Sequence, residues 1–439
     1  MDIVRTEAES ALIARASDNQ IEGPEWLKDL QDAARDEFQS LGLPHRRVEE
    51  WKYTDLKSGM RTAFDLADAG GAVDVSADAV MAKLPDGLAE REAYHLIVVN
   101  GVLNQGLSET EISGGVEVLS LKDALLANAE WIKPLGAVQQ ADRDAIQALN
   151  LATMQGGVCV RVPEGAKLDK PLHVIFVTTG AGPRAVASRL FFDIGREADV
   201  QLIESHVSLE DAPVESNVAG EFIVGSRAKF RHMKMTMDHN DSVHLANFVG
   251  RLGEETDYGF FQLVLDGGIS RNQFEMRYDG NDAIANISGA ALLQGKSHAD
   301  LTLVMDHAAT GCVSRELFKT VLDDQARAVF QGKVIVQPGA QKTDGEMMSK
   351  ALLLSDDAEF DSKPELEIYA DDVLCGHGAT TGQIDEDLLF YLRARGIPEK
   401  EARALLIQAF FGEALELVED EAVRDVMIEQ AVNWYSKTR

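Results

Sequence analysis

A cysteine and a histidine in the last fifth of the chain have the residue types and spacing of a metal-binding pair. One glycine separates Cys375 from His377, and Gly378 follows them. If this stretch is extended, alternate residues face the same side, so the two side chains lie about 6.6 Å apart along the strand. A thiolate and an imidazole together suit iron, zinc or an iron–sulfur species. The flanking glycines leave the backbone bare, so another chain or a cluster can approach closely.

Two ligands do not close a metal site, and the pair has a second interpretation. The missing ligands would have to come from elsewhere in the fold or from a partner chain. Alternatively, Cys375 is a buried small side chain and His377 a hydrogen-bonded histidine at a sheet edge. The spacing alone leaves both interpretations open.

Other motifs in the sequence favour no catalytic chemistry. Residues 289–297 imitate a phosphate-binding loop, but five residues separate the glycines where the loop needs four, so the backbone N–H groups would not converge on phosphates. Met233, Met235 and Met237 alternate along an expected strand, where methionine is more often packing than a soft-metal ligand. The chain has no GxSxG and no HExxH motif. The sequence therefore predicts no catalytic and no cofactor-binding residue.

The elements that would position the pair are short strands with a regular spacing. From about residue 157, apolar residues alternate in runs of roughly four to eight residues, which is typical of strands. Many runs open with a small residue two positions before an apolar one, beginning at residues 198, 228, 256, 285, 299, 328 and 358. The steps of 30, 28, 29, 14, 29 and 30 residues favour a coil of stacked strands, a parallel β-helix. A large antiparallel sandwich with chance spacing is the alternative.

Helical patterns flank the strands on both sides. Apolar residues recur at helical spacing over the first 60 residues, over 121–130 and 140–154, and again over 385–395, 399–418 and 421–436. We therefore divide the chain into an N-terminal helical and α+β region (1–150), a strand core (151–382) and a C-terminal helical region (383–439). The C-terminal amphipathic helices either pack on the core or dock a partner protein.

Charge and composition exclude several classes of function. The chain has 42 Lys and Arg against 73 Asp and Glu, a net charge of −31, which opposes binding to nucleic acid and to anionic membranes. No apolar stretch approaches the roughly 18 residues that a membrane span needs. Three widely spaced cysteines, and an acidic N-terminus without the features of a signal or transit peptide, predict a reducing, cytoplasmic location.

Segments along nearly the whole chain resemble the SufB/SufD family of iron–sulfur cluster assembly scaffolds. Residues 46–56 resemble the SufD branch rather than the SufB branch. At Gly376 many family members have serine, and we expect little effect because small size is what the position needs. The remaining similarity is carried by residues 314–319, 330–333, 340–345, 352–355, 363–368, 371–380, 385–392, 395–398 and 401–403.

The resemblance implies a mainly β fold, a right-handed parallel β-helix flanked by N-terminal and C-terminal helical regions. It implies a non-catalytic scaffold subunit that pairs with SufB through the β-helix and binds the ATPase SufC through the C-terminal helices. It also implies a cytoplasmic subunit that forms a homodimer when isolated. The cofactor implied is iron or a nascent iron–sulfur cluster, transient and shared with SufB, with none expected in the isolated chain.

The resemblance also assigns roles to particular residues. His377 matches the family histidine near the nascent cluster, and Cys375 matches the adjacent family cysteine. Both are expected metal ligands, although the match leaves open whether Cys375 itself binds. Contact with SufC is expected from apolar residues of the C-terminal helices, namely Leu405, Leu406, Phe410, Phe411 and Trp434.

Two other classes of function are alternatives. A carbohydrate-acting enzyme on a β-helix would need paired carboxylates in a groove, and Asp371 and Asp372 do not form such a pair in a strand because neighbours face opposite sides. A structural adaptor would have the same fold without a metal role. A glycan-hydrolysis screen tests the enzyme, and the iron content of the anaerobically purified complex separates scaffold from adaptor.

Overall fold

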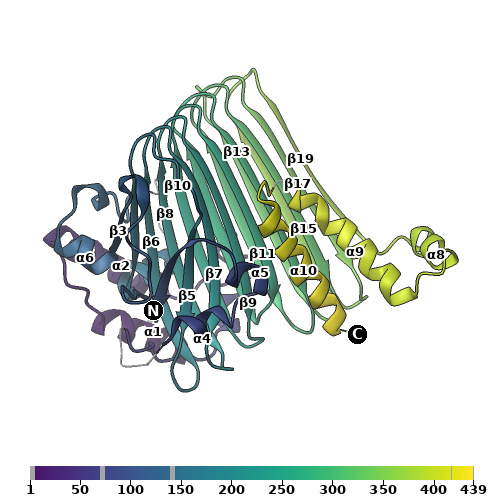
Figure 1. Ribbon diagram of the computed structural model, residues 1–439, viewed down its shortest axis with the longest axis horizontal. Coiled ribbons are helices and arrows are strands. Elements are labelled where there is room, and N and C mark those ends of the chain that lie inside the picture. Colours follow the sequence, from purple (N-terminus) through teal and green to yellow (C-terminus); the bar gives the residue numbers. More distant parts are fainter. Residues whose placement is uncertain (1–4, 70–74, 139–143, 417, 439) are drawn as a thin grey trace.

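The core of the molecule is a parallel β-helix whose turns stack side by side (Figure 1). The structure is a computed structural model that describes residues 5–69, 75–138, 144–416 and 418–438. Each full turn contributes one strand to each of two sheets, so consecutive strands alternate between the sheets. From β4 to β19 all neighbouring pairs are parallel, and antiparallel pairs occur where β2 joins β1 and β3 joins β4.

The two sheets, named here sheet I and sheet II, run across the whole β-helix. In spatial order, sheet I contains β19 (Leu374–Gly382), β17 (Asp344–Leu353), β15 (Val313–Leu322), β13 (Ile284–Leu293), β11 (Asp257–Asp266), β9 (Lys229–Asp238), β7 (Asp199–Ser208), β5 (Leu172–Thr178), β1 (Tyr94–Val99) and β2 (Val102–Leu103). Sheet II contains β18 (Glu359–Ile368), β16 (Arg327–Val336), β14 (His298–His307), β12 (Ile269–Tyr278), β10 (Val243–Leu252), β8 (Val214–Val224), β6 (Arg184–Ile194), β4 (Gly156–Val162) and β3 (Glu117–Ser120).

The predicted sequence repeat corresponds to the turns of this β-helix. The openings at residues 198, 228, 256 and 285 lie at the start of β7, β9, β11 and β13 in sheet I, and those at 299, 328 and 358 lie at the start of β14, β16 and β18 in sheet II. The half-step of 14 residues is the passage from one sheet to the other. The β-helix prediction is confirmed, and the antiparallel-sandwich alternative is wrong.

Apolar side chains fill the interior between the two sheets. Alternate residues of each strand point inward, and phenylalanine side chains from successive turns meet there. The ring centroids of Phe248 and Phe274 are 5.1 Å apart, and those of Phe260 and Phe274 are 4.1 Å apart. Each such pair adds about 0.5–1.5 kcal/mol beyond the burial of its area, so these contacts help to hold successive turns together.

Helices and short 3-10 turns precede and follow the strands. The division predicted at residue 150 falls inside α7, and β1–β3, which precede it, already belong to the two sheets. None of the described helices is both long and apolar enough to span a bilayer. The helical elements are α1 (Glu7–Asp18), α2 (Glu25–Leu41), η1 (Glu49–Trp51), α3 (Leu56–Gly59), α4 (Ala77–Met81), α5 (Asp86–Ala89), η2 (Ser113–Gly115), α6 (Leu121–Leu126), η3 (Glu130–Ile132), α7 (Ala145–Thr153), α8 (Glu386–Ala394), α9 (Glu399–Leu415) and α10 (Glu421–Thr438).

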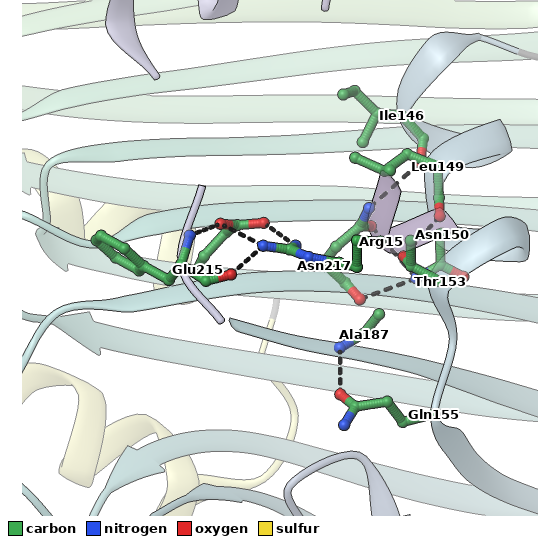
Figure 2. Close-up of polar contacts among 10 residues, drawn as sticks. Arg15, Ile146, Leu149, Asn150, Thr153, Gln155, Ala187, Glu215 and Asn217 are labelled. Carbon is green, nitrogen blue, oxygen red and sulfur yellow. Dashed lines mark hydrogen bonds and ion pairs between the residues drawn. The ribbon is translucent and has the colours of Figure 1, made fainter. Parts of the chain in front are cut away.

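Polar contacts hold the N-terminal helices on the outer face of sheet II (Figure 2). Arg15 of α1 donates through Nη1 to Oε1 of Glu215 in β8 at 2.5 Å, and the backbone N–H of Phe64 donates to Oε2 at 2.9 Å. Asn150 of α7 donates to the carbonyl of Asn217 at 2.8 Å. Because Glu215 is buried, loss of Arg15 would leave an unpaired charge, which costs about 3–5 kcal/mol.

The C-terminal helices α9 and α10 cover the outer face of sheet I. Phe411 and Trp434 are buried in an apolar cluster with residues of β9, β11 and β15. The indole Nε1 of Trp434 donates to Oδ2 of Asp266 at 2.9 Å. Glu419 pairs with Lys229 at 2.6 Å. In contrast, α8 stands away from the sheets at the right of Figure 1.

Candidate functional site

The β-helix ends in two edge strands. β18 pairs with β16 and β19 pairs with β17, and each lies at the outer edge of its sheet. Large apolar side chains are exposed at this end, including Tyr369 at 60% and Leu374 at 72%. Unpaired strand edges and exposed apolar side chains are features of a surface that another chain covers.

The two edge strands differ in how close another molecule can come. β18 contains Pro364 flanked by Lys363 and Glu365, and proline and charge both discourage the addition of a strand. β19 contains small residues, and a methyl group placed on Gly376 would meet no atom within 4 Å. β19 is therefore the edge that allows close approach of a backbone or a cluster.

β19 carries the predicted pair in register with the interior of the β-helix. Cys375 is aligned with Gly345 of β17, and His377 with Met347. Met347 is buried in the interior cluster, and Cys375 packs against the same cluster. His377 continues this column but is exposed, because it lies on the last strand of its sheet. The structure thus brings both side chains to the open end of the interior.

The thiol and the imidazole differ in their readiness to bind a metal. Burial raises the pKa of the Cys375 thiol, and the negative charges of Asp344 and Glu316 raise it further. The thiol must therefore lose a proton against this field before it binds a metal as thiolate. A neutral imidazole offers a lone pair without losing a proton. His377 is consequently the readier ligand of the two.

The pair does not form a complete metal site within one chain. Over the described ranges, no group of three or more His, Cys, Asp and Glu side chains is arranged to hold a metal ion. Closed structural sites for zinc have four ligands, whereas this strand supplies two candidates. The remaining ligands would have to come from a second molecule at the open end.

A buried carboxylic acid beneath this end was missed by sequence reasoning. Glu316 of β15 is in register with Met347, and thus lies two strands below His377 in the same column. Among the described residues, none donates a hydrogen bond of normal geometry to the carboxylate oxygens of Glu316. The Ser314 side chain nevertheless lowers the pKa of Glu316 and offsets part of the rise that burial causes. Burial raises the pKa of Glu316 to about 8. Glu316 lies two residues before the interior residue Phe318 in β15, so strand alternation was the signal that could have placed it in the interior.

The residues predicted to bind a partner divide into exposed and buried ones. Leu405 is 46% exposed, whereas Phe411 is 1% and Trp434 is 5% exposed. Leu406 and Phe410 are half-buried against the cluster that joins the helices to sheet I. In this structure, Phe411 and Trp434 therefore hold the helices on the β-helix, and Leu405 is free to contact a partner.

Three further exposed apolar residues lie on α8, which sequence reasoning did not single out. Leu388, Phe390 and Tyr391 are all exposed, Phe390 at 72%. The run of apolar residues at 388–391 was the available sequence signal for this exposed surface. Together with Leu405 of α9 they form what we call the α8–α9 apolar set.

The other sequence motifs have structural roles. Met233 and Met235 pack between sheet I and the C-terminal helices. Residues 289–293, the first part of the phosphate-loop imitation, lie inside strand β13. A strand does not gather backbone N–H groups around a phosphate as a loop before a helix does.

Two family models match the chain. Residues 176–410 match the model described as "SUF system FeS cluster assembly, SufBD core domain". Residues 13–174 match the model described as "SufBD protein N-terminal region". The core match covers more than half of the chain and includes β19.

Individual proteins with similar sequences come from several bacteria. The chain is 32% identical over 413 residues to the iron–sulfur cluster assembly protein SufD of Escherichia coli K12, covering 92% of this chain and 91% of that protein. It is 30% identical over 433 residues to a SufBD family protein of Synechocystis, covering 94% and 93%. It is 23% identical over 431 residues to SufD of Bacillus subtilis, covering 92% and 93%. The chain therefore belongs to the SufBD family of the SUF iron–sulfur cluster assembly system.

Proposed function

We propose that this chain is a SufD-type scaffold subunit, without catalysis of its own, in a cytoplasmic complex that assembles iron–sulfur clusters. The observation that carries the proposal is the position of His377, exposed on the last strand of a stiff β-helix beside Cys375. The printed names of the E. coli and Synechocystis relatives, both iron–sulfur cluster assembly proteins, support the same function.

A SufB-type subunit supplies what the open end lacks. It covers the edge of β19 and the exposed side chains of Tyr369 and Leu374, which removes apolar surface from water. It also brings further ligands to the two that β19 offers. When that partner is absent, a second copy of this chain covers the same end, which gives a homodimer.

Iron or a nascent cluster is held transiently at the shared interface, and the isolated chain retains none. His377 provides an imidazole nitrogen to iron. Cys375 adds a thiolate once its proton has passed to solvent, a step that burial of the thiol makes harder. Iron and sulfide enter while the interface between the subunits is open.

A SufC-type ATPase binds the C-terminal helices and opens the interface. Its contact surface is the α8–α9 apolar set, which lies exposed while α9 and α10 are anchored on sheet I. ATP-driven dimerisation of two such ATPases pulls on these helices. The force passes to the β-helix through buried apolar contacts and ion pairs such as Glu413 with Lys350 at 3.3 Å.

Replacement of His377 by alanine tests the metal role. The variant is expressed together with SufB-type and SufC-type subunits and purified without oxygen. Iron and sulfide per complex should fall at least about tenfold, the lower end of the cost of disturbing a metal's ligand environment. Recovery of the two partner subunits should not change, because the exposed imidazole contributes little to folding.

His95→Ala is the matched control, because His95 lies on β1 near the opposite edge of sheet I. This variant should keep the wild-type iron content. If the His377→Ala complex kept the wild-type iron content, His377 would have no metal role and the chain would be a structural adaptor.

A further inference from the structure

A second polar site lies inside the β-helix, far from β19. A cavity of about 430 Å³ is lined by the ends of β5, β7 and β9, by the starts of β6 and β8, and by Ser242 just before β10. His206 of β7 and Asp238 of β9 both line it. In sheet I, β9 is five strand spacings from β19, a separation of about 24 Å. This cavity is therefore distinct from the open end that carries His377.

The imidazole of His206 is held in one tautomer by a buried carboxylate. Its Nε2 donates to Oε1 of Glu204 at 2.7 Å. Glu204 also accepts from His232 at 2.9 Å and lies 3.4 Å from the ammonium of Lys234, so its carboxylate oxygens act as acceptors. Nε2 therefore carries the proton, and Nδ1 carries a lone pair.

That lone pair has no partner in the described part of the chain. The His206 side chain is 7% exposed, and the contacts of its ring nitrogens with polar groups are those of Nε2. A carboxylate on one imidazole nitrogen and a free lone pair on the other is the arrangement found at histidine metal ligands, where the carboxylate orients the ring and makes it more basic.

The neighbouring buried groups contact one another, although Nδ1 of His232 and Nδ1 of His244 have no hydrogen-bond partner in the described part of the chain. His232 donates through Nε2 to Oε2 of Glu204 at 2.9 Å. Lys234 lies 3.4 Å from Oε1 of Glu204 and donates to Nε2 of His244 at 2.9 Å. The charges of Lys234 and Glu204 thus offset each other. Of this cluster, His206 and Asp238 line the cavity, whereas Glu204, His232, Lys234 and His244 do not.

Both groups lie next to His244. The ring centroid of His206 is 4.7 Å from that of His244, and Nδ1 of His244 is 3.5 Å from Oδ2 of Asp238. The cavity lining contains the carboxylates of Glu210, Asp211 and Asp238 against the single ammonium of Lys83. The carboxylates of the lining outnumber its ammonium, which favours a cation, although burial raises the pKa of Asp238.

We propose that His206 and Asp238 bind a divalent first-row transition-metal ion in this cavity, with water molecules completing the coordination. An imidazole nitrogen with a carboxylate suits borderline ions such as iron, cobalt or zinc better than calcium or magnesium, which take oxygen ligands. Glu204 acts behind His206 as the group that orients the ligand. The site is independent of the cluster-assembly interface, because both ligands come from one chain.

Titration of the full-length isolated chain with Co²⁺ tests this site. Wild type should bind one Co²⁺ with an absorption band of nitrogen and oxygen ligation and a raised melting temperature. Asp238→Asn keeps the side-chain shape but removes the anionic ligand, and His206→Asn removes the imidazole. Each should weaken Co²⁺ binding at least about tenfold, since even a residue behind a ligand contributes that much.

His95→Ala is the control, and it should bind Co²⁺ as wild type does, because His95 does not line the cavity. Undiminished affinity in Asp238→Asn would overturn the proposal, and so would the absence of bound Co²⁺ in wild type. If His206→Asn does not fold, Asp238→Asn decides the question alone, because Asp238 is not needed to neutralise Glu204. The outcome is separate from the cluster yield of the His377 variant, which is measured in the complex.

Discussion

At the scale of single residues, the environment of each side chain decides what it can do at the open end. Cys375 is half-buried over the interior, and this raises its thiol pKa. His377, two residues later, is exposed. The sequence predicted that both share a face, because strand geometry alone determines this. Exposure was not predictable, because it depends on whether a further turn of the β-helix covers the strand.

Glu316 gives a prediction on pH-dependent stability. Its pKa is about 8 in the folded chain, raised by burial above the ordinary 4.5. The stabilising contribution of the neutral acid is therefore complete below pH 4.5 and is lost as the pH rises through about 8. Glu316→Gln stays neutral, so near pH 7 it should remove a penalty on the order of 3 kcal/mol. Urea unfolding midpoints at pH 5 and pH 8 measure this.

The control for this prediction is Glu346→Gln, on an exposed side chain of the adjacent strand β17. It should keep the wild-type decline of unfolding free energy between the two pH values. An equal decline in Glu316→Gln would show that this carboxyl group is not the neutral acid of the interior.

The buried charges near Met233 show where residue patterns mislead. His232 and Lys234 alternate with Met233 and Met235, and such alternation is typical of a strand with one face in water. Instead, His232 and Lys234 are buried inside the β-helix, and the methionines are buried under the C-terminal helices. Both faces of sheet I are covered here, which no alternation within one strand can indicate.

At the scale of elements, the repeat was predictable because small residues recur at the starts of its strands. Small residues open seven of the strands, at positions 198, 228, 256, 285, 299, 328 and 358. A second regularity, in the backbone conformation, does not appear in the residue types. Residues with positive φ lie two positions before strands of sheet I, and their types differ: Glu197, Arg227, Glu255, Asp282 and Lys342. The left-handed conformation there is imposed by the corner between sheets, since Glu, Arg and Lys rarely adopt it alone.

The C-terminal helices were predicted either to pack on the core or to dock a partner protein, and the structure shows that they pack on sheet I. Phe411 and Trp434 lie against sheet I, while Leu405 and Phe390 are exposed. A helical stripe of apolar residues does not indicate which of them meets the chain's own sheet, because that depends on the path of the chain after β19.

Leu405→Glu tests docking at the scale of the helix. A carboxylate at a contact that excludes water should weaken capture of a SufC-type ATPase at least about tenfold, because such a contact typically carries more than 1.4 kcal/mol. Co-purification of the ATPase with the SufB-type partner present measures the effect. Leu126→Glu is the matched control, since Leu126 is similarly exposed on α6 at 51%. Equal capture by both variants would contradict the assignment of Leu405.

At the scale of the whole molecule, the two ends of the β-helix are unlike. The first end finishes in β2 and β3, which pair antiparallel with their neighbours, and the last end finishes in β18 and β19. Repeat proteins need a covering element at each end. The proposed function therefore places the second subunit at the end formed by β18 and β19.

The arrangement of helices around the core was not predictable from sequence. The N-terminal helices are held by contacts such as Arg15 with Glu215, which are 200 positions apart. No sequence pattern around Arg15 or Glu215 predicts that the two residues are in contact. Local periodicity specifies elements, whereas long-range contacts between single side chains decide which face of a sheet they cover.

The identity of the nitrogen bound to iron tests the proposed function most directly. This chain, with its histidines labelled with ¹⁵N, is assembled with unlabelled SufB-type and SufC-type subunits without oxygen, and the reduced cluster is studied by pulsed electron paramagnetic resonance. A ¹⁵N coupling should appear in wild type and in His95→Ala, and should vanish in His377→Ala. A cluster that forms in wild type without any ¹⁵N coupling would contradict ligation of iron by His377.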